Sequence, residues 1–111
     1  MSILKEIYKY KKDFVKQKKK LLNLNDVIKL SEQYVPKRFI DNIKKNIKEK
    51  DISIIGELKK ASPSAGIIFD NKDDYLNIAN TYEENGISCL SILTDEKYFK
   101  GFDSDLTEIR T

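Results

Sequence analysis

Two short apolar runs decide the fold of this 111-residue chain: Ile52-Ser53-Ile54-Ile55-Gly56-Glu57-Leu58 and Ile87-Ser88-Cys89-Leu90-Ser91-Ile92-Leu93. Both are rich in β-branched residues and bounded by polar segments, which is typical of strands that are buried on both faces. Between them, a helix is predicted to start at Asp73 or Asp74, with apolar residues at helical spacing, and to stop at the glycine of Asn85-Gly86. A strand, a helix and a second strand predict a βαβ unit with parallel strands and a right-handed crossover.

The segments that follow the two strands fit the same pattern. Residues 60–66, rich in serine with one proline and one glycine, are expected to form a loop after the first strand. A second helix is expected to begin near Asp103, after the loop that ends at Gly101. Residues 51–111 are therefore predicted to be the first two βα units of an α/β protein.

The first 50 residues have a different period. Apolar side chains between Ile3 and Leu22 are spaced mostly three and four residues apart, with lysines between them, as in an amphipathic helix. A short second helix is predicted to start at a cap on Asn25 or Asp26, and a third to carry Pro36 in its first turn. Residues 1–50 are thus expected to form a helical extension.

The net charge of +3 conceals an asymmetry between the two halves. Residues 1–50 hold 15 Lys and Arg against 6 Asp and Glu, net +9, whereas residues 51–111 hold 6 against 12, net −6. The run Lys16-Gln17-Lys18-Lys19-Lys20 is the best case for nucleic-acid binding, but its lysines fall around the helix without an interleaved aromatic platform. We interpret it as a solvated helix face and expect no nucleic-acid partner.

Membrane insertion and secretion are also not expected. No apolar run approaches the roughly 18 residues of a membrane-spanning helix. The N-terminus is charged from Lys5 onward, which is unlike a signal peptide. The sequence predicts a cytoplasmic protein with no membrane partner.

The residue types present restrict the chemistry. The chain has no histidine, which excludes imidazole bases, Ser-His and Cys-His nucleophile pairs and the commonest metal ligand. Its one cysteine, Cys89, lies inside the second apolar run and is expected to pack as a small hydrophobic residue. Any chemistry must therefore use Lys, Glu, Asp or Ser.

Glu57 and Lys59 are the first candidates for that chemistry. They lie two residues apart at the C-terminal end of the first strand, so their side chains share a face at the edge where parallel α/β proteins assemble active sites. An ammonium beside a carboxylate supplies an acid or anion clamp together with a base or orienting group. A structural ion pair at the strand end is the alternative interpretation.

The two loops that follow the strands hold weaker candidates. Residues 60–66 offer hydroxyls, amides and a glycine that can hold an anion, although the spacing is not that of a P-loop and a plain turn remains the alternative. In the second loop, Tyr98 and Phe99 fit either stacking on an aromatic ligand or covering the end of the sheet.

Two longer motifs resemble one family. The stretches are Ile54-Ile55-Gly56-Glu57-Leu58-Lys59-Lys60-Ala61-Ser62-Pro63-Ser64 and Ser91-Ile92-Leu93-Thr94-Asp95-Glu96-Lys97-Tyr98-Phe99-Lys100-Gly101. In this order they resemble the indole-3-glycerol phosphate synthases, and the lysine-rich start resembles that family's extra N-terminal helices. The resemblance implies the N-terminal part of a (β/α)8 TIM barrel: lid helices over residues 1–50, two βα units over 51–111, and an end before barrel closure.

The resemblance also implies an activity and its residues. The enzyme would be a carbon–carbon lyase, a carboxy-lyase of tryptophan biosynthesis. It would convert the phosphorylated small molecule 1-(2-carboxyphenylamino)-1-deoxyribulose 5-phosphate to indole-3-glycerol phosphate, with loss of carbon dioxide and water and without a metal or organic cofactor. Glu57 and Lys59 would be catalytic, Ser62 would contact substrate, and Phe99 would form part of the wall for the anthranilate ring. Ala65, where many members have lysine, and Gly56, often alanine, depart from the family.

Truncation is the larger departure. The family's acid lysine on the third strand, its glutamate on the fifth and its phosphate-binding loops after the seventh and eighth would lie beyond Thr111. A closed barrel typically needs about 250 residues. The chain alone is therefore expected to be inactive and to need a complementing C-terminal part of the barrel. The alternative is a non-catalytic fragment that self-associates to cover its sheet edges and binds phosphate weakly.

Overall fold

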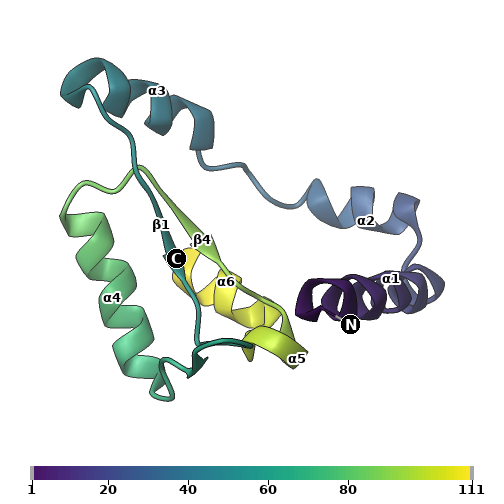
Figure 1. Ribbon diagram of the computed structural model, residues 1–111. Helices are drawn as coiled ribbons and strands as arrows, with labels where there is room; N and C mark the ends of the chain where they lie inside the picture. Colours follow the sequence, from purple (N-terminus) through teal and green to yellow (C-terminus); the bar gives the residue numbers. More distant parts are fainter. Residues whose placement is uncertain (1, 111) are drawn as a thin grey trace. The chain divides into compact units, whose positions relative to one another are not determined.

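The computed structural model describes residues 2–110, apart from the side chain of Lys72, and divides the chain into two compact units, Met1–Lys37 and Arg38–Thr111. The first unit holds helices α1 (Ile3–Leu21) and α2 (Leu24–Ser31). The second holds, in order, α3 (Phe39–Lys50), β1 (Ile55–Leu58), β2 (Ala61–Ser62), β3 (Gly66–Ile67), α4 (Lys72–Glu84), β4 (Cys89–Ile92), α5 (Glu96–Phe99) and α6 (Asp103–Arg110) (Figure 1). The helix α3 thus belongs to the same unit as the strands.

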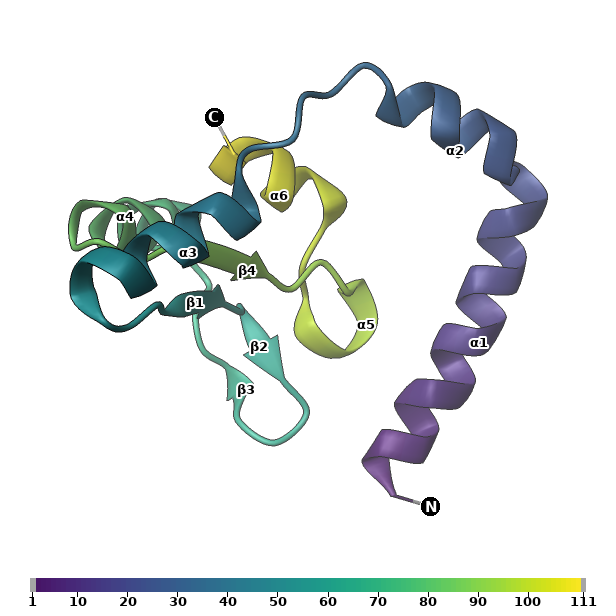
Figure 2. The ribbon, with the colours of Figure 1, turned by 90° about the horizontal axis from the view of Figure 1, so that it is seen from above.

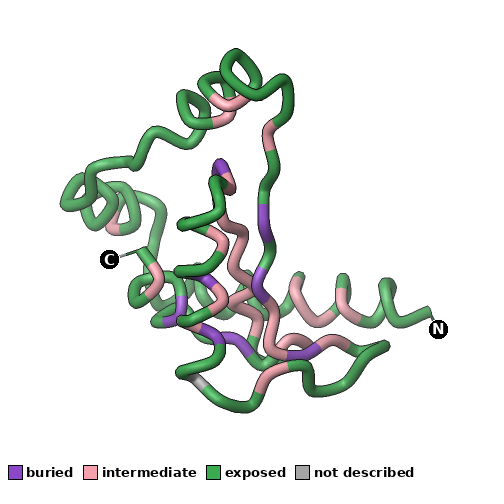
Figure 3. Tube along the Cα trace, turned by 90° about the vertical axis from the view of Figure 1, so that its left-hand side faces the viewer, coloured by how far each residue is buried: buried purple, intermediate pink, exposed green. Residues whose placement is uncertain are grey.

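The helices of the first unit follow from local signals. Ser2 caps α1 by accepting a hydrogen bond from the backbone N–H of Lys5, and three lysines in the last turn complement the helix dipole. The start predicted for α2 was wrong by two or three residues, because Asn23 rather than Asn25 or Asp26 is the cap. Neither helix has a buried residue, and Figure 3 accordingly shows no buried segment in them.

The predicted βαβ unit is confirmed in the second unit. The strands β1 and β4 pair in parallel, with Ile55 opposite Cys89 and Glu57 opposite Ser91. The helix α4 connects them and packs against β1 (Figure 1). The helix α4 starts at Lys72, capped by Asn71, so the start predicted at Asp73 or Asp74 was slightly late. Gly86, at φ +83°, follows its end as the sequence predicts. The structure is therefore a mixed α/β unit built on one parallel strand pair.

A small core lies between the strands and α4. Leu58, Tyr75 and Ala79 are buried, and partly buried apolar side chains surround them. Gly56 leaves room for two side chains, because a Cβ there would lie 3.2 Å from the Tyr82 side chain, on α4, and 2.6 Å from that of Ile87, just before β4. Figure 3 shows the buried residues concentrated in this second unit.

Two features differ from the sequence-based expectation. Residues 60–66 are not only a loop, since β2 and β3 form a short antiparallel hairpin with Ala61 opposite Ile67 (Figure 2). The helix α3 begins at Phe39, so Pro36 lies outside it rather than in its first turn. A two-residue strand has no detectable periodicity, which explains the first difference.

The helix α3 is attached at the N-terminal ends of the strands. The side-chain amide of Asn46 donates to the Ser88 hydroxyl at 2.5 Å and to the Gly86 carbonyl at 3.3 Å. Ser53 shares a second 2.5 Å hydrogen bond with Ser88. This end of the strand pair is therefore held by polar contacts, and the opposite end carries the candidate site.

Within residues 2–110, no helix is long and apolar enough to cross a membrane. The cytoplasmic location stays a sequence-based prediction. The division at residue 50, which rests on the change of hydrophobic period, also stays a prediction.

Candidate functional site

The structure brings Glu57 and Lys59 together at the C-terminal end of β1. Strand geometry places both side chains on one face, and the Lys59 Nζ lies 3.2 Å from Glu57 Oε1. Their side chains are 36% and 45% exposed, so water still reaches the pair. An ion pair this exposed contributes at most about 1 kcal/mol to folding.

Neighbouring elements complete the surroundings of this pair. The Ser91 hydroxyl, on β4, donates to Glu57 Oε2 at 3.2 Å. The Lys59 Nζ lies 5.8 Å from the centroid of the Phe99 ring, at the end of α5. A lysine within about 6 Å of a ring centroid is in the range of a cation–π contact. The site therefore combines an ammonium, a carboxylate, a hydroxyl and an apolar wall.

Ser62 lies in β2, but its hydrogen bonds remain within its own turn. Its hydroxyl oxygen accepts from the backbone N–H of Ala65 at 3.0 Å and lies 3.4 Å from the Ser64 hydroxyl. The helix α5, which ends at Phe99, contacts β2. The structure thus places Ser62 on a strand next to α5. Among the described residues, Ser62 makes no hydrogen bond to Glu57 or Lys59.

Lys60 serves a structural purpose although it follows Lys59 directly. Its Nζ donates to Asp105 Oδ2 at 2.7 Å, and the same oxygen accepts from the backbone N–H of Phe102 at 2.9 Å. The Lys60 carbonyl accepts from the backbone N–H groups of Ile68 and Phe69. The side chains of Lys60 and Asp105 are both largely buried. Their ion pair therefore fixes the first βα loop to the start of α6.

Tyr75 lies beside this buried ion pair. It is 2% exposed, and in the described part of the chain its hydroxyl has no hydrogen-bond partner. Burial, and then the negative charge of Asp105, raise the pKa of Tyr75 to about 12. Both causes disfavour the phenolate in the folded chain.

This raised pKa predicts a loss of stability in strong alkali. The unfolded chain releases the Tyr75 proton near pH 10, and the folded chain keeps it up to about pH 12. The free energy of unfolding should therefore be unaffected by this group below about pH 10 and fall between about pH 10 and 12. We expect Tyr75→Phe to remove this component of the fall, as measured by urea unfolding across the pH range. Tyr8→Phe, on an exposed side chain, is the matched control and should leave the fall unchanged.

Cys89 behaves as expected from its place in the apolar run. The thiol is partly buried, and burial raises its pKa. The thiol donates a weak 3.5 Å hydrogen bond to the carbonyl of Phe39, on α3. A raised pKa reduces the thiolate fraction at neutral pH, so the geometry supports a packing role.

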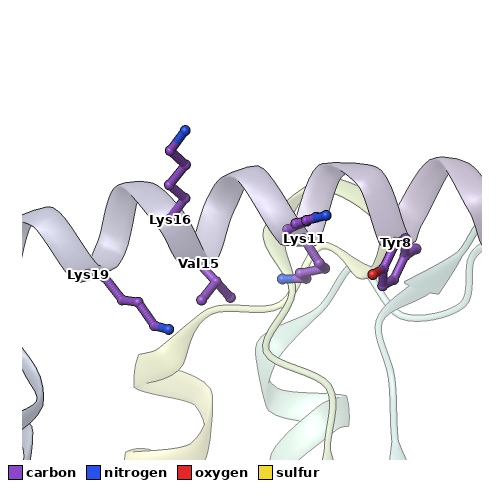
Figure 4. A pocket seen from close by; sticks show the side chains of 6 residues that line it. Tyr8, Lys11, Val15, Lys16 and Lys19 are labelled. Atoms are coloured by element: carbon purple, nitrogen blue, oxygen red, sulfur yellow. The ribbon is translucent and has the colours of Figure 1, made fainter.

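Two shallow cavities lie outside this group of residues. One, of about 260 Å³, is lined by Lys60, Ile67, Phe69, Asp70, Asn71, Lys100 and Phe102. The other, of about 450 Å³, lies on α1 and is lined by Tyr8, Lys11, Lys12, Val15, Lys16 and Lys19 (Figure 4). Figure 4 shows Lys16 extending to the opposite side of the helix from Val15 and Lys19. A specific anion site requires cationic side chains that converge on one point, and the lysines that line this cavity do not converge.

The described residues show no group of three or more carboxylates or thiols placed to hold a metal ion. The structure brings together Glu57, Lys59 and Phe99, which were predicted from the sequence, and adds Ser91, which was not. Ser91 is opposite Glu57 only because of the strand register, so no local motif marks it.

Comparison with known proteins gives one family. Residues 4–111 match the family model described as indole-3-glycerol phosphate synthase. Relatives with that name include a protein of Thermoanaerobacter pseudethanolicus, 37% identical over 97% of this chain, and one of Prochlorococcus marinus strain MED4, 41% identical over 99%. A chloroplastic relative of Arabidopsis thaliana is 41% identical over 99% of the chain. The chain spans only 40%, 37% and 28% of the lengths of these three relatives. With a match over nearly all of its residues, the chain belongs to the indole-3-glycerol phosphate synthase family.

Proposed function

We propose that this chain supplies one part of the active site of an indole-3-glycerol phosphate synthase, a carboxy-lyase of tryptophan biosynthesis. The observation that carries the proposal is the Glu57–Lys59 pair at the C-terminal end of β1, with the Phe99 ring beside the ammonium. Family membership supports the reaction, and the position of the pair supports its catalytic use. The substrate would be 1-(2-carboxyphenylamino)-1-deoxyribulose 5-phosphate.

The reaction requires an acid and a group that controls it. Ring closure joins the aromatic carbon that bears the carboxylate to the carbonyl carbon of the sugar chain, and the carboxylate leaves as carbon dioxide. The carbonyl oxygen becomes a hydroxyl, which leaves as water while the methylene carbon next to the nitrogen gives up a proton to form the ring double bond. Both changes at this oxygen need a proton. We assign Lys59 to contact the substrate anions and to assist the acid chemistry. Glu57 would orient Lys59 or handle protons.

The remaining assignments concern substrate binding. Phe99 would cover one face of the anthranilate ring, because its ring lies beside the Lys59 ammonium and presents an apolar surface. Ser62 would contact the substrate from β2 after a change in its local hydrogen bonds, since its hydroxyl now closes the turn to Ala65. Residues 1–50 would act as lid helices and 51–111 as the first two βα units of the barrel.

We further propose that catalysis needs additional βα units. Among residues 2–110, β1 and β4 pair only with each other, so each has an unpaired edge. Ile54 and Ile55 of the first apolar run are about half exposed. Parallel strands normally have both neighbours and both faces covered, and a C-terminal part of the barrel would supply these contacts. The same exposed edges favour the second candidate, a self-associating fragment with weak phosphate binding.

One experiment separates these functions. The chain is tested alone, and also joined to the remaining βα units of the Thermoanaerobacter pseudethanolicus relative, and formation of indole-3-glycerol phosphate is followed by indole fluorescence. The expected result is turnover in the joined protein and none in the chain or the added units alone. A folded joined protein without turnover would contradict the proposed synthase function. A dimer of the chain that binds inorganic phosphate would then favour the second candidate.

A further inference from the structure

We propose that Ser91 is a positioning residue for the Glu57–Lys59 pair. Its hydroxyl would donate to one oxygen of the Glu57 carboxylate, Oε2. This contact would hold the carboxylate in the orientation that directs its other oxygen, Oε1, at the Lys59 ammonium. The inference rests on the proposed function, because it assigns Ser91 a role in the same reaction. Ser91 acts through Glu57 and touches neither substrate nor cofactor.

The strand register places these groups together. Glu57 and Ser91 are directly opposite one another in the parallel pair of β1 and β4. The Ser91 hydroxyl lies 3.2 Å from Glu57 Oε2, and the Lys59 ammonium lies 3.2 Å from Oε1. Each oxygen of one carboxylate therefore has a different donor. Two donors on separate strand positions fix both the place and the rotation of the carboxylate, which a single ion pair does not.

This arrangement bears on Lys59. A lysine has a flexible four-carbon stem, so its ammonium is placed only by its contacts. Glu57 lies on one side of it at 3.2 Å, and the Phe99 ring centroid lies 5.8 Å away. Glu57 itself is 45% exposed and can rotate into water when one donor is removed. Loss of the Ser91 hydroxyl should therefore displace the Lys59 ammonium without removing any charged group.

Ser88, three residues before Ser91, has a hydroxyl with a structural role. Ser88 is 8% exposed, and its hydroxyl is hydrogen bonded to both Asn46 and Ser53 at 2.5 Å, at the opposite end of the strands. The Ser91 bond is longer and joins a carboxylate that is nearly half exposed, so it contributes less to folding. Ser88 is therefore the matched control for a purely structural effect.

The test uses the joined protein described above, with Ser91→Ala, Ser91→Thr and Ser88→Ala. A hydrogen bond to a charged but partly exposed group is expected to change kcat by about tenfold on removal. We expect Ser91→Ala to lower kcat by about tenfold and to change KM by less than about twofold. Ser91→Thr keeps the hydroxyl and suits a strand, so it should recover most of the loss. Ser88→Ala should lower the thermal midpoint while leaving kcat within about twofold of the unsubstituted protein.

A double-mutant cycle with Glu57→Ala identifies the route of the effect. If Ser91 acts only through Glu57, then Ser91→Ala should have no further effect on kcat in the Glu57→Ala protein. An equal loss in both backgrounds, or a Ser91→Ala protein with unchanged kcat, would overturn the positioning role while the synthase function stands. Absence of turnover in the unsubstituted joined protein would instead overturn the synthase function, and the role of Ser91 with it.

Discussion

Lys59→Ala is expected to lower kcat/KM of the joined protein by about 10²-fold to 10⁴-fold, the usual contribution of a positioned acid or base. The physical reason is that Lys59 is the lysine paired with Glu57, whereas the adjacent Lys60 is bound to Asp105 at 2.7 Å and is not placed to replace it. Turnover is measured by indole fluorescence over a range of substrate concentrations. The substitution should leave the thermal midpoint nearly unchanged, because the ion pair that it removes is exposed.

The matched control for this prediction is Lys48→Ala. Lys48 is exposed in the last turn of α3, the helix attached at the opposite end of the strands, and its replacement removes the same charge. We expect its kcat/KM to stay within about twofold of the unsubstituted protein. Equal losses in the two variants would show that net charge, rather than the place of Lys59, controls the rate. Full activity in Lys59→Ala would refute its assignment as an acid.

Gly101→Ala should be the most destabilising single substitution among the glycines of the second unit. A Cβ at this position would overlap the carbonyl oxygen of Leu93 and lie 2.9 Å from the Cα of Thr94. These are backbone atoms at the end of β4, so no side-chain rotation relieves the overlap. We expect a loss of about 3 kcal/mol in the free energy of unfolding, the upper range for an overpacked site. Urea unfolding of the chain, followed by circular dichroism, measures it.

Gly66→Ala provides the comparison. Gly66 has φ +68°, which costs a residue with a side chain about 1 kcal/mol, but no atom lies within 4 Å of a Cβ built there. The two variants thus separate steric overlap from backbone strain. If Gly101→Ala unfolds at the same urea concentration as the unsubstituted chain, the close contact between residues 93 and 101 is not present in solution.

The sequence predicts the parts of the fold that have a period. The apolar runs around Leu58 and Leu90 and the helix between them were identified because a buried strand and an amphipathic helix leave different spacings of apolar residues. The hairpin of β2 and β3 was missed, since two residues per strand give no spacing to detect. The cap of α2 was placed too late, because several Asn and Asp residues lie close together near Asn23.

The candidate site was predictable where it is local in sequence. Glu57 and Lys59 share a face because they are two residues apart on one strand, and this holds before any tertiary contact is known. Ser91 and Asp105 reach their partners across 34 and 45 residues, and those contacts depend on strand register and on the position of α6. Glu57 and Lys59 were therefore predictable from the sequence. Ser91, which contacts Glu57, and Asp105, which holds the loop after β1, were not.

The attachment of α3 has a consequence for folding during synthesis. This helix precedes β1 in the chain, yet Asn46 bonds to Gly86 and Ser88, which follow it by 40 and 42 residues. Because a chain emerges from the ribosome N-terminus first, α3 must wait without these partners until β4 is exposed. The helix has no buried residue of its own with which to stabilise itself in the meantime. We therefore expect α3 to become ordered on the ribosome only after α4 and the start of β4 have been made.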